Sequence, residues 1–420
     1  MSPKAQANQL KEACKSSEYL MQLRCSELLE FKKQNQRNSS KSVLNAQESF
    51  LKYSLNNKKY VGSFVVTSDG QTLVNIDSSS YSDNERFIKV WHLDTGKLIY
   101  SLNNHGYSGF DVSSDGQILV TENSYYDNEK YTQVNAIKAW NLKTGKLRYT
   151  LLEDEELFRR NLILSNDGQT LVGSSKVGSS KENIKVWNLK TGKLLYTIND
   201  NSHPNTISLN GQTLVTVNHV NEKININLRN LGTGQLKHSY YLNKSVSDKL
   251  IVPKVVISPN SKIMVVGYEE NIAVIDIITG SIKYTLNGYN KNISNIEGRS
   301  FYSMIFAISP DSETLVTSHP KSIKTWNLET GRLKNTLEDN IETKGHSAIA
   351  ISPNNKTIVT VTETEPIKVW DLNTGKLKTT LIGHKETNDL AFTSNAKTLI
   401  SVSRGSYDDK NKTIKVWQLP

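Results

Sequence analysis

The sequence predicts an all-β fold, an eight-bladed β-propeller of four-stranded antiparallel blades, and three observations lead to it. A motif built on Ile-Lys-Val-Trp recurs eight times, a turn sequence precedes each copy, and the array begins with an extra strand and ends one strand short. The motif ends at Trp91, Trp140, Trp187, Trp326, Trp370 and Trp417, with Arg229 and Ile275 in the same place in two eroded copies. These marks lie 49, 47, 42, 46, 51, 44 and 47 residues apart. A period in the forties with strand-like content indicates a radial array of small sheets.

One repeat, residues 110–151, shows the four strands of a blade. Alternating apolar residues predict strands at residues 110–113, 118–121, 137–140 and 147–151. Asp115-Gly116 and Thr144-Gly145 form the two turns, because Asp caps the backbone and Gly adopts positive φ. A long polar loop joins the second and third strands. Such a sheet cannot bury both faces alone, so the copies must stack face to face.

Equivalent first turns appear in every copy, and their number agrees with the number of third strands. They lie at residues 68–70, 113–116, 165–168, 210–211, 258–260, 309–311, 352–354 and 393–395. Eight blades are therefore expected. A seven-bladed ring with one irregular copy displaced is the structural alternative.

The two ends of the array predict how the ring closes. The last copy stops at residues 417–420 and has no fourth strand, whereas residues 53–57 match the fourth-strand sequence at 100–104. We expect this N-terminal strand to complete the last blade, which removes the open edge. The domains predicted are a short α-helical N-terminal extension and linker at residues 1–48 and the propeller at residues 49–420.

These turns and third strands resemble the WD-repeat (β-transducin-like) family, in the style of bacterial and especially cyanobacterial members. The first turn is similar to the family's Ser-Pro-Asp-Gly, the third strand to its Ile-Lys-x-Trp-Asp, and Thr-Gly-Lys-Leu to the following turn. The resemblance covers residues 50–420. It implies a non-catalytic propeller that serves as a scaffold for protein–protein contacts.

The repeats also depart from the family pattern. Trp-Asp occurs only at Trp370-Asp371, and Gly-His is in register only at Gly383-His384. The resemblance therefore implies the family's hydrogen-bond network in one blade at most, with His384, Ser403 and Trp417 as members. We treat the six Trp residues and His384 as structural. Blades four and five, which lack the Trp, are expected to be the least regular and the softest.

Long loops between the second and third strands predict a binding surface on one face of the ring. Blades eight, one and two are neighbours after closure, and their loops are rich in Tyr, Ser, Asn and Asp. Tyr supplies rigid amphipathic area, while Ser and Asn adapt their hydrogen bonds. The predicted partner site consists of Tyr81, Asp83, Tyr125, Tyr126, Asp127, Tyr131, Tyr407 and Asp408. The alternative is that these loops are solvated and unselected.

A small-ligand or metal-ion sensor is the alternative function. Asp83-Asn84-Glu85, Asp127-Asn128-Glu129 and Asp408-Asp409 offer hard oxygen ligands of the kind calcium takes, but their spacing fits no calcium loop. The eight His residues are scattered without ligand spacing, and no phosphate loop or dinucleotide motif occurs. We therefore expect no enzyme activity, no metal and no cofactor.

Charge and composition point to a cytoplasmic protein rather than a nucleic-acid or membrane protein. The net charge is +10, but many of the Lys residues belong to the repeat and are expected to form a solvated rim, with no basic run. No stretch reaches the about 18 apolar residues that span a bilayer. The two cysteines, Cys14 and Cys25, provide no disulfide framework. The partner and the oligomeric state cannot be read from the sequence.

The first 48 residues differ in kind from the repeats. Apolar residues recur there at roughly helical spacing among Lys, Glu and Gln, at Leu10, Cys14, Leu20, Met21, Leu28 and Leu29. A helix packed on the propeller's rim and a helix that tethers the propeller to a partner both remain open.

Overall fold

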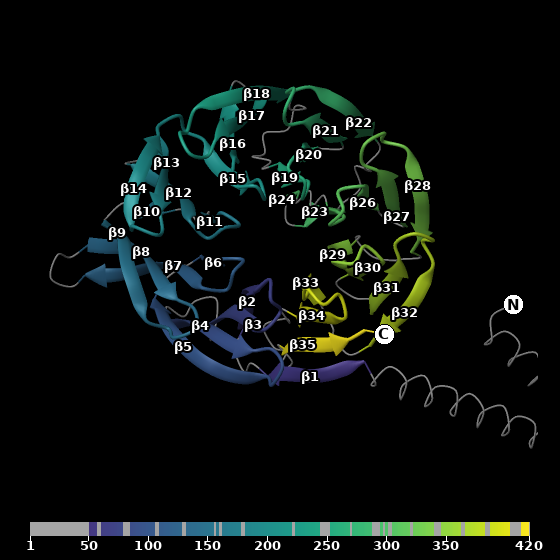
Figure 1. The fold of residues 1–420 in the computed structure, drawn as a ribbon, viewed down its shortest axis with the longest axis horizontal. Coiled ribbons are helices and arrows are strands. Elements are labelled where there is room, and N and C mark those ends of the chain that lie inside the picture. Colours follow the sequence, from purple (N-terminus) through teal and green to yellow (C-terminus); the bar gives the residue numbers. More distant parts are fainter. Residues whose placement is uncertain are drawn as a thin grey trace, which may run out of the picture. The chain divides into compact units, whose positions relative to one another are not determined.

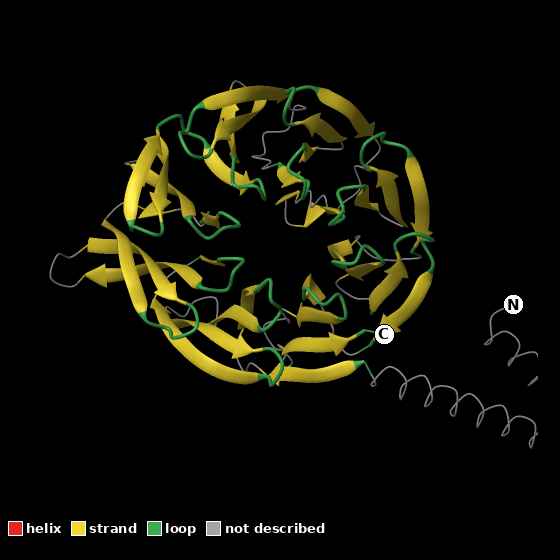
Figure 2. Cartoon of the chain, in the orientation of Figure 1, coloured by secondary structure: helices red, strands yellow, loops and turns green. Residues whose placement is uncertain are grey.

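The computed structural model divides into two units, Met1–Leu51 and Lys52–Pro420. It describes residues 50–419 with gaps at 57–59, 79–84, 106–108, 128–131, 155–156, 159–161, 178–180, 221–222, 244–252, 269–270, 288–294, 297–298, 301–304, 320–321, 340–345, 363–365, 383–386 and 404–412. The predicted helical extension at residues 1–48, including Cys14 and Cys25, lies outside the described residues. Strands make up all the regular structure that is described (Figure 2).

The first four blades follow one another around the ring of Figure 1. Blade one consists of β2 (Tyr60–Val66), β3 (Thr72–Ser78), β4 (Glu85–His92) and β5 (Lys97–His105). Blade two consists of β6 (Phe110–Val112), β7 (Ile118–Asp127), β8 (Thr132–Asn141) and β9 (Leu147–Asp154). Blade three consists of β10 (Leu157–Phe158), β11 (Ile163–Leu164), β12 (Thr170–Val177), β13 (Lys181–Asn188) and β14 (Lys193–Ile198). Blade four consists of β15 (His203–Ile207), β16 (Thr213–Val220), β17 (Lys223–Asn230) and β18 (Leu236–Asn243).

The remaining blades complete the circle. Blade five consists of β19 (Lys254–Ile257), β20 (Ile263–Tyr268), β21 (Asn271–Asp276) and β22 (Ile282–Asn287). A small hairpin of β23 (Asn295–Ile296) and β24 (Arg299–Ser300) follows it. Blade six consists of β25 (Phe306–Ile308), β26 (Thr314–His319), β27 (Ser322–Asn327) and β28 (Leu333–Glu338). Blade seven consists of β29 (His346–Ile351), β30 (Thr357–Thr362), β31 (Ile367–Asp371) and β32 (Leu377–Leu381).

Blade eight joins the two ends of the propeller sequence. Its strands are β33 (Thr387–Phe392), β34 (Thr398–Ser403), β35 (Thr413–Gln418) and β1 (Leu51–Asn56), and β1 pairs with β35. The predicted closure by the N-terminal strand is confirmed, as is the eight-bladed architecture. The seven-bladed alternative is wrong, because every repeat forms its own sheet.

Two blades depart from the expected plan. In blade two, most of the predicted polar loop is strand: β7 and β8 pair over ten residues, from Ile118 opposite Asn141 to Asp127 opposite Thr132. Backbone groups pair whatever the side chains are, so such a ladder can form without apolar alternation. In blade three, the inner strand is split into β10 and β11, which both pair with β12.

Apolar clusters between neighbouring sheets form the core. One cluster joins Ile88 and Val90 of blade one to Leu119 of blade two, all fully buried. Full burial of such a side chain contributes about 1.5–3 kcal/mol. Blades four and five, predicted to be the least regular, have unbroken four-stranded pairing and share a cluster of 13 buried residues. In the part of the chain that the structure describes, no helix is long and apolar enough to cross a membrane.

Candidate interaction surfaces and the contacts that position them

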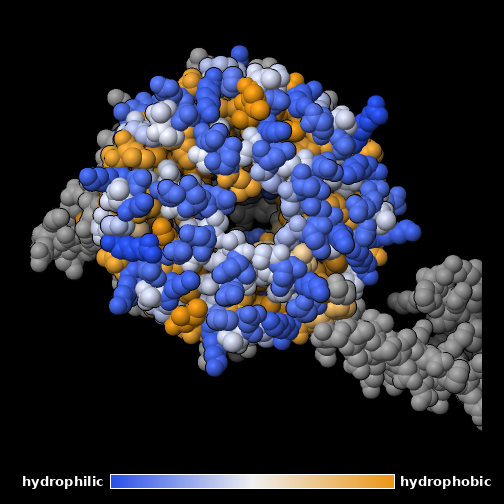
Figure 3. Space-filling model, in the orientation of Figure 1, coloured by the Kyte–Doolittle hydropathy of each residue, from blue (hydrophilic) through white to orange (hydrophobic). Residues whose placement is uncertain are grey.

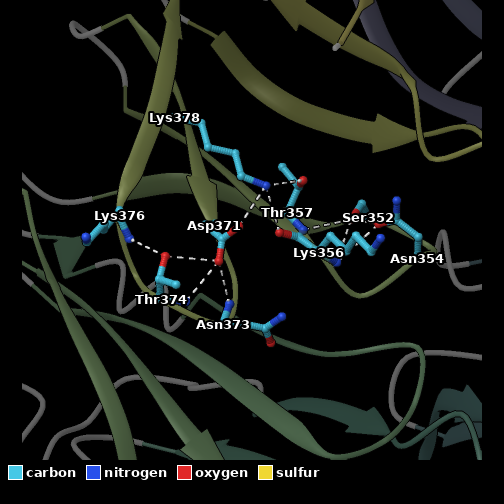
Figure 4. Close-up of polar contacts among 9 residues, drawn as sticks. All are labelled: Ser352, Asn354, Lys356, Thr357, Asp371, Asn373, Thr374, Lys376 and Lys378. Atoms are coloured by element: carbon cyan, nitrogen blue, oxygen red, sulfur yellow. Dashed lines mark hydrogen bonds and ion pairs between the residues drawn. The ribbon is translucent and has the colours of Figure 1, made fainter.

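The turn between the third and fourth strands is capped by the residue that follows the Trp position. In blade seven, the carboxylate of Asp371 accepts hydrogen bonds from the backbone N–H groups of Asn373 and Thr374 at 3.1 and 2.9 Å (Figure 4). Asn327 of blade six caps Thr330 in the same way at 2.8 Å. Asn therefore replaces the Asp of the family motif without loss of the turn, because either side chain provides the accepting oxygen.

Asp371 differs from the Asn caps by its charge. Lys378 Nζ lies 3.0 Å from Asp371 Oδ2, and it also donates to the carbonyl oxygen of Lys356 at 3.2 Å (Figure 4). The backbone hydrogen bond from Thr374, followed by that from the Lys378 side chain, lowers the pKa of Asp371 to about 2. The carboxylate is therefore charged at every pH near neutrality.

Tyrosines on five of the outer strands link their blades to the next blade. The hydroxyl of Tyr100 in β5 donates to the carbonyl oxygen of Leu142 in blade two at 2.5 Å, and burial raises the pKa of Tyr100 to about 12. Its ring lies against Gly145, where an added Cβ would be 3.1 Å away. The other pairs of this kind are Tyr53 with Leu93, Tyr149 with Lys190, Tyr196 with Leu231 and Tyr284 with Leu328. This contact was not predicted from the sequence.

The Trp of each third strand has a partner on the second strand. Trp91, Trp140, Trp326 and Trp370 donate from Nε1 to Asn75, Thr121, Thr317 and Thr360, respectively. The indole of Trp417 donates to Ser401 Oγ at 2.8 Å instead of to the predicted Ser403. The acceptor is two residues beyond the cross-strand partner of the Trp, which for Trp417 is Leu399. His384 lies outside the described residues.

Three blades solve this contact differently. In blade three, Gly173 occupies the acceptor position and leaves room for the ring of Trp187, which is 1% exposed. In blade four, Arg229 Nε donates to Thr216 Oγ1 at 3.4 Å, and Arg229 forms an ion pair with Asp200, which lies between β14 and β15. In blade five, Ile275 has Val266 at the equivalent place, and both are fully buried. The repeats that lack the Trp therefore still place two compatible side chains in contact at this position.

First turns link neighbouring blades near the centre. The turn residue with positive φ is Gly in blades one to four and Ser261, Ser312, Asn355 or Ala396 in blades five to eight. Ser312 Oγ accepts from the backbone N–H of Asn260 at 3.0 Å, and Asn355 Oδ1 accepts from that of Asp311 at 3.2 Å. Side chains at these strained positions thus hold the preceding blade.

Two charged groups on the innermost strands were also not predicted from the sequence. Asp111 of β6 accepts from the backbone N–H of Leu164 in blade three at 2.9 Å, and burial raises the pKa of its carboxyl. Lys254 of β19 places its ammonium 5.0 Å from the ring centre of Phe306 in blade six. Burial lowers the pKa of Lys254, and Asp389 opposes this change. Both groups connect blades instead of marking a reactive site.

The repeated basic residues divide into two sets. Lys97, Lys146, Lys193, Arg332 and Lys376 are exposed, as expected for a solvated rim. The third-strand Lys residues are half-buried, so the expectation that they form part of a solvated rim is wrong. Lys89 Nζ lies 2.5 Å from the buried carboxylate of Asp77, and Lys368 pairs with the buried Asp339 of blade six. Their partners are distant in the sequence, so the pairing was not visible there.

The predicted partner site is described only in part. The structure places Tyr125, Tyr126 and Asp127 on β7, where their backbones pair with Val134, Gln133 and Thr132. Tyr81, Asp83, Tyr131, Tyr407 and Asp408 lie outside the described residues. The β7–β8 ladder is four residue pairs longer than the β26–β27 ladder of blade six, which has six pairs. In Figure 1 it extends beyond the neighbouring sheets.

The described residues contain no group of three or more His, Cys, Asp or Glu side chains that could hold a metal ion. Of the predicted acidic residues, only Glu85 and Asp127 lie within this part of the chain.

The chain is similar to known proteins in one part of its sequence and in its fold. A sequence model for the family described as "WD domain, G-beta repeat" matches residues 375–418, which contain β32 and the three inner strands of blade eight. These residues are similar to a WD40 repeat, and the eight sheets form a β-propeller. No curated protein matches the chain.

Two solved structures share the fold. The computationally designed protein Ika8 has a TM-score of 0.59 and 21% sequence identity, over 88% of this chain and 100% of that chain. Sqt1 of Chaetomium thermophilum, solved with the N-terminus of ribosomal protein L10 bound, has a TM-score of 0.63 and 14% identity over the same shares. At these identities the likeness concerns the fold alone.

Proposed function

We propose that the chain is a non-catalytic protein-interaction scaffold, cytoplasmic and of bacterial type, which binds a protein partner through the second-to-third-strand hairpins of blades eight, one and two. The long β7–β8 ladder supports this proposal most directly. It is two pairs longer than the eight-pair ladders of blades three and four, and it includes the backbones of Tyr125 and Tyr126. A rigid support lowers the entropic cost of binding through aromatic side chains.

The propeller fold gives further support. The WD40 repeat at residues 375–418 belongs to a family of interaction modules, and the Sqt1 propeller holds a segment of another protein. The contacts between blades described above make the ring a rigid platform for loops. Loops on a rigid scaffold are where binding residues concentrate.

Affinity purification with mass spectrometry from the native organism tests the proposal. Wild type is compared with the combined variant Tyr81→Ala, Tyr126→Ala, Tyr407→Ala, after thermal melting has shown that the variant folds. The matched control is Tyr241→Ala on β18, an exposed tyrosine (59%) away from these hairpins. We expect a specific partner with wild type and the control, and its loss with the triple variant. Recovery of the same partner with the triple variant contradicts the proposed surface, and substrate turnover by the purified chain contradicts the non-catalytic role.

A further inference from the structure

We propose that a second binding surface lies at the seam between blades two and three and takes an acidic peptide segment with interleaved apolar side chains. The seam consists of the two third-to-fourth-strand turns with the first residues of β9 and β14, residues 141–148 and 188–195. These turns lie at the opposite end of the strands from the β7–β8 hairpin. The surface is therefore separate from the Tyr-rich hairpins.

Five exposed cations gather at the seam. They are Lys143, Lys146, Arg148, Lys190 and Lys193. The two turns contain no Asp or Glu, and none of the five cations forms an ion pair with another described residue. The seam therefore carries positive charge that its own turns leave unopposed.

The equivalent turns of blades one, five, six and seven contain an acidic residue, whereas the turn of blade four, residues 230–237, contains none. Asp94 lies 3.5 Å from Lys52, Glu329 lies 2.6 Å from Lys283, and Asp371 lies 3.0 Å from Lys378. The first turns of blades two and three do carry Asp115 and Asp167, but each carboxylate accepts hydrogen bonds within its own turn. The two turns of the seam together carry five cations and no acidic residue, whereas the turn of blade four carries only Lys237.

Apolar side chains stand between these cations. Leu147, Leu194 and Leu195 are 48%, 49% and 49% exposed. At the position of Leu195, six of the eight outer strands carry a basic residue, namely Lys52, Arg148, Lys237, Lys283, Lys334 and Lys378. A basic residue on an edge strand opposes pairing with another chain, and β14 lacks it. In β5, Ile99 likewise replaces the basic residue, but the turn before it contains the acidic Asp94.

The two halves of the seam are held together by a direct contact. The hydroxyl of Tyr149 in β9 donates to the carbonyl oxygen of Lys190 at 3.0 Å. Its ring also packs on Gly192, where an added Cβ would be 3.1 Å away. A preformed surface costs less entropy to bind.

This combination fits a peptide better than a membrane or a nucleic acid. An extended segment can pair with the open edge of β14, place its carboxylates near the cations and its apolar side chains on the leucines. A membrane needs a wide basic face, whereas Asp276, Glu329 and Asp371 occupy the turns of blades five to seven. Figure 3 shows apolar patches between hydrophilic ones along the rim, including the left side, where β9 and β14 lie in Figure 1.

Fluorescence anisotropy with the full chain tests the proposal. The probe is a short labelled peptide that alternates Glu and Leu, and a matched peptide replaces each Leu with Ser. The seam variant is Lys146→Glu, Lys193→Glu. The control is Arg332→Glu, Lys376→Glu, which changes the same turn position in blades six and seven.

We expect the seam variant to bind the Glu/Leu peptide about tenfold or more weakly than wild type, and the control to remain within about twofold. Added salt should weaken binding, and the Ser peptide should bind less tightly than the Leu peptide. Absence of peptide binding to wild type overturns the proposal, and so does equal loss in seam variant and control. A second outcome also overturns the proposal: the seam variant, but not the control, stops binding phosphatidylserine-containing vesicles while its peptide binding is unchanged. That result assigns the seam to a lipid surface. The seam variant should still bind any partner held by the Tyr-rich hairpins, so the two proposals are tested independently.

Discussion

At the scale of single residues, the positive-φ position of the first turn shows how one backbone geometry is met by different side chains. Gly avoids strain at Gly168, where a Cβ would lie 2.8 Å from Ser113 Cβ of the preceding blade. Ser312 accepts the strain but gains a hydrogen bond to the preceding blade. Ala396, with φ 58°, has the strain and no polar group to offset it.

Ala396→Gly and Ser312→Gly should therefore differ. Relief of left-handed strain should make Ala396→Gly more stable than wild type by about 0.5–1 kcal/mol. In Ser312→Gly the same relief is offset by loss of a hydrogen bond worth about 0.5–1.5 kcal/mol, so its stability should change little. Urea unfolding midpoints measure both changes. Equal stabilisation by the two substitutions would show that the Ser312 contact contributes nothing.

Asp371 gives a prediction about acid stability. Its pKa of about 2 in the folded chain is below the value of about 3.9 for an unfolded Asp. The charged form therefore contributes stability above pH 4, and this contribution is lost as the pH falls from about 4 to about 2. Asp371→Asn keeps the cap, so the stability difference between wild type and variant should shrink over this range. Thermal melting across the range measures it, and a constant difference would mean that the charge has no role.

At the scale of elements, the contact of each outer-strand tyrosine with the following turn stabilises the order of the blades. Gly331→Ala tests it, because Gly331 has φ 70° and an added Cβ would lie 2.9 Å from the ring of Tyr284. Gly211→Ala is the control, since Gly211 has φ 67° with no atom within 4 Å of an added Cβ.

We expect Gly211→Ala to cost about 1 kcal/mol from backbone strain alone. Gly331→Ala should cost about 1–2 kcal/mol more, because the ring and the turn must move apart. Chemical denaturation compares the two variants. Equal losses of stability in the two variants would mean that the Tyr284 ring moves aside at no cost in free energy.

The sequence predicted elements well where local pattern decides them. Turn residues and the Trp-centred strands repeat at one spacing, so the blades could be counted. The β7–β8 ladder was read as a loop because its residues are polar, whereas its backbone pairing depends on the partner strand. The link between Tyr100 and Leu142 joins residues 42 positions apart and could not be assigned to a contact without the fold. A signal was present, since Tyr and the Thr-Gly turn recur together in several repeats.

The candidate site was predictable in kind but not in arrangement. The Tyr-rich composition of the hairpins is visible in the sequence, and three of its residues are now placed on β7. The seam could not be found from composition, because Lys residues of the same repeat are half-buried on third strands and exposed in turns. Only the fold separates the two sets and shows which turns lack an acidic neighbour.

At the scale of the whole molecule, stability depends on closure of the ring by β1. Leu55 of β1 is 5% exposed and packs with Ile414 and Val416 of β35, and Tyr53 reaches the carbonyl oxygen of Leu93 in blade one. The strand therefore joins blade eight to blade one while completing blade eight.

Two truncations isolate this contribution. A chain without residues 1–56 loses β1, whereas a chain without residues 1–49 keeps it. We expect the shorter chain to melt at roughly 5 °C or more below the longer one, because it lacks the buried side chain of Leu55 and leaves the outer edge of β35 unpaired. Equal melting temperatures would contradict closure by this strand.

The central claim is that the ring holds a protein partner on the long hairpins, and cross-linking mass spectrometry of the purified complex tests it most directly. Lys130 and Lys410 lie in the hairpin segments of blades two and eight and can react with a lysine cross-linker. We expect the partner to cross-link to these two lysines and the combined variant Tyr81→Ala, Tyr126→Ala, Tyr407→Ala to abolish those products. A complex whose cross-links fall only on blades five to seven, and survive that variant, would contradict the claim.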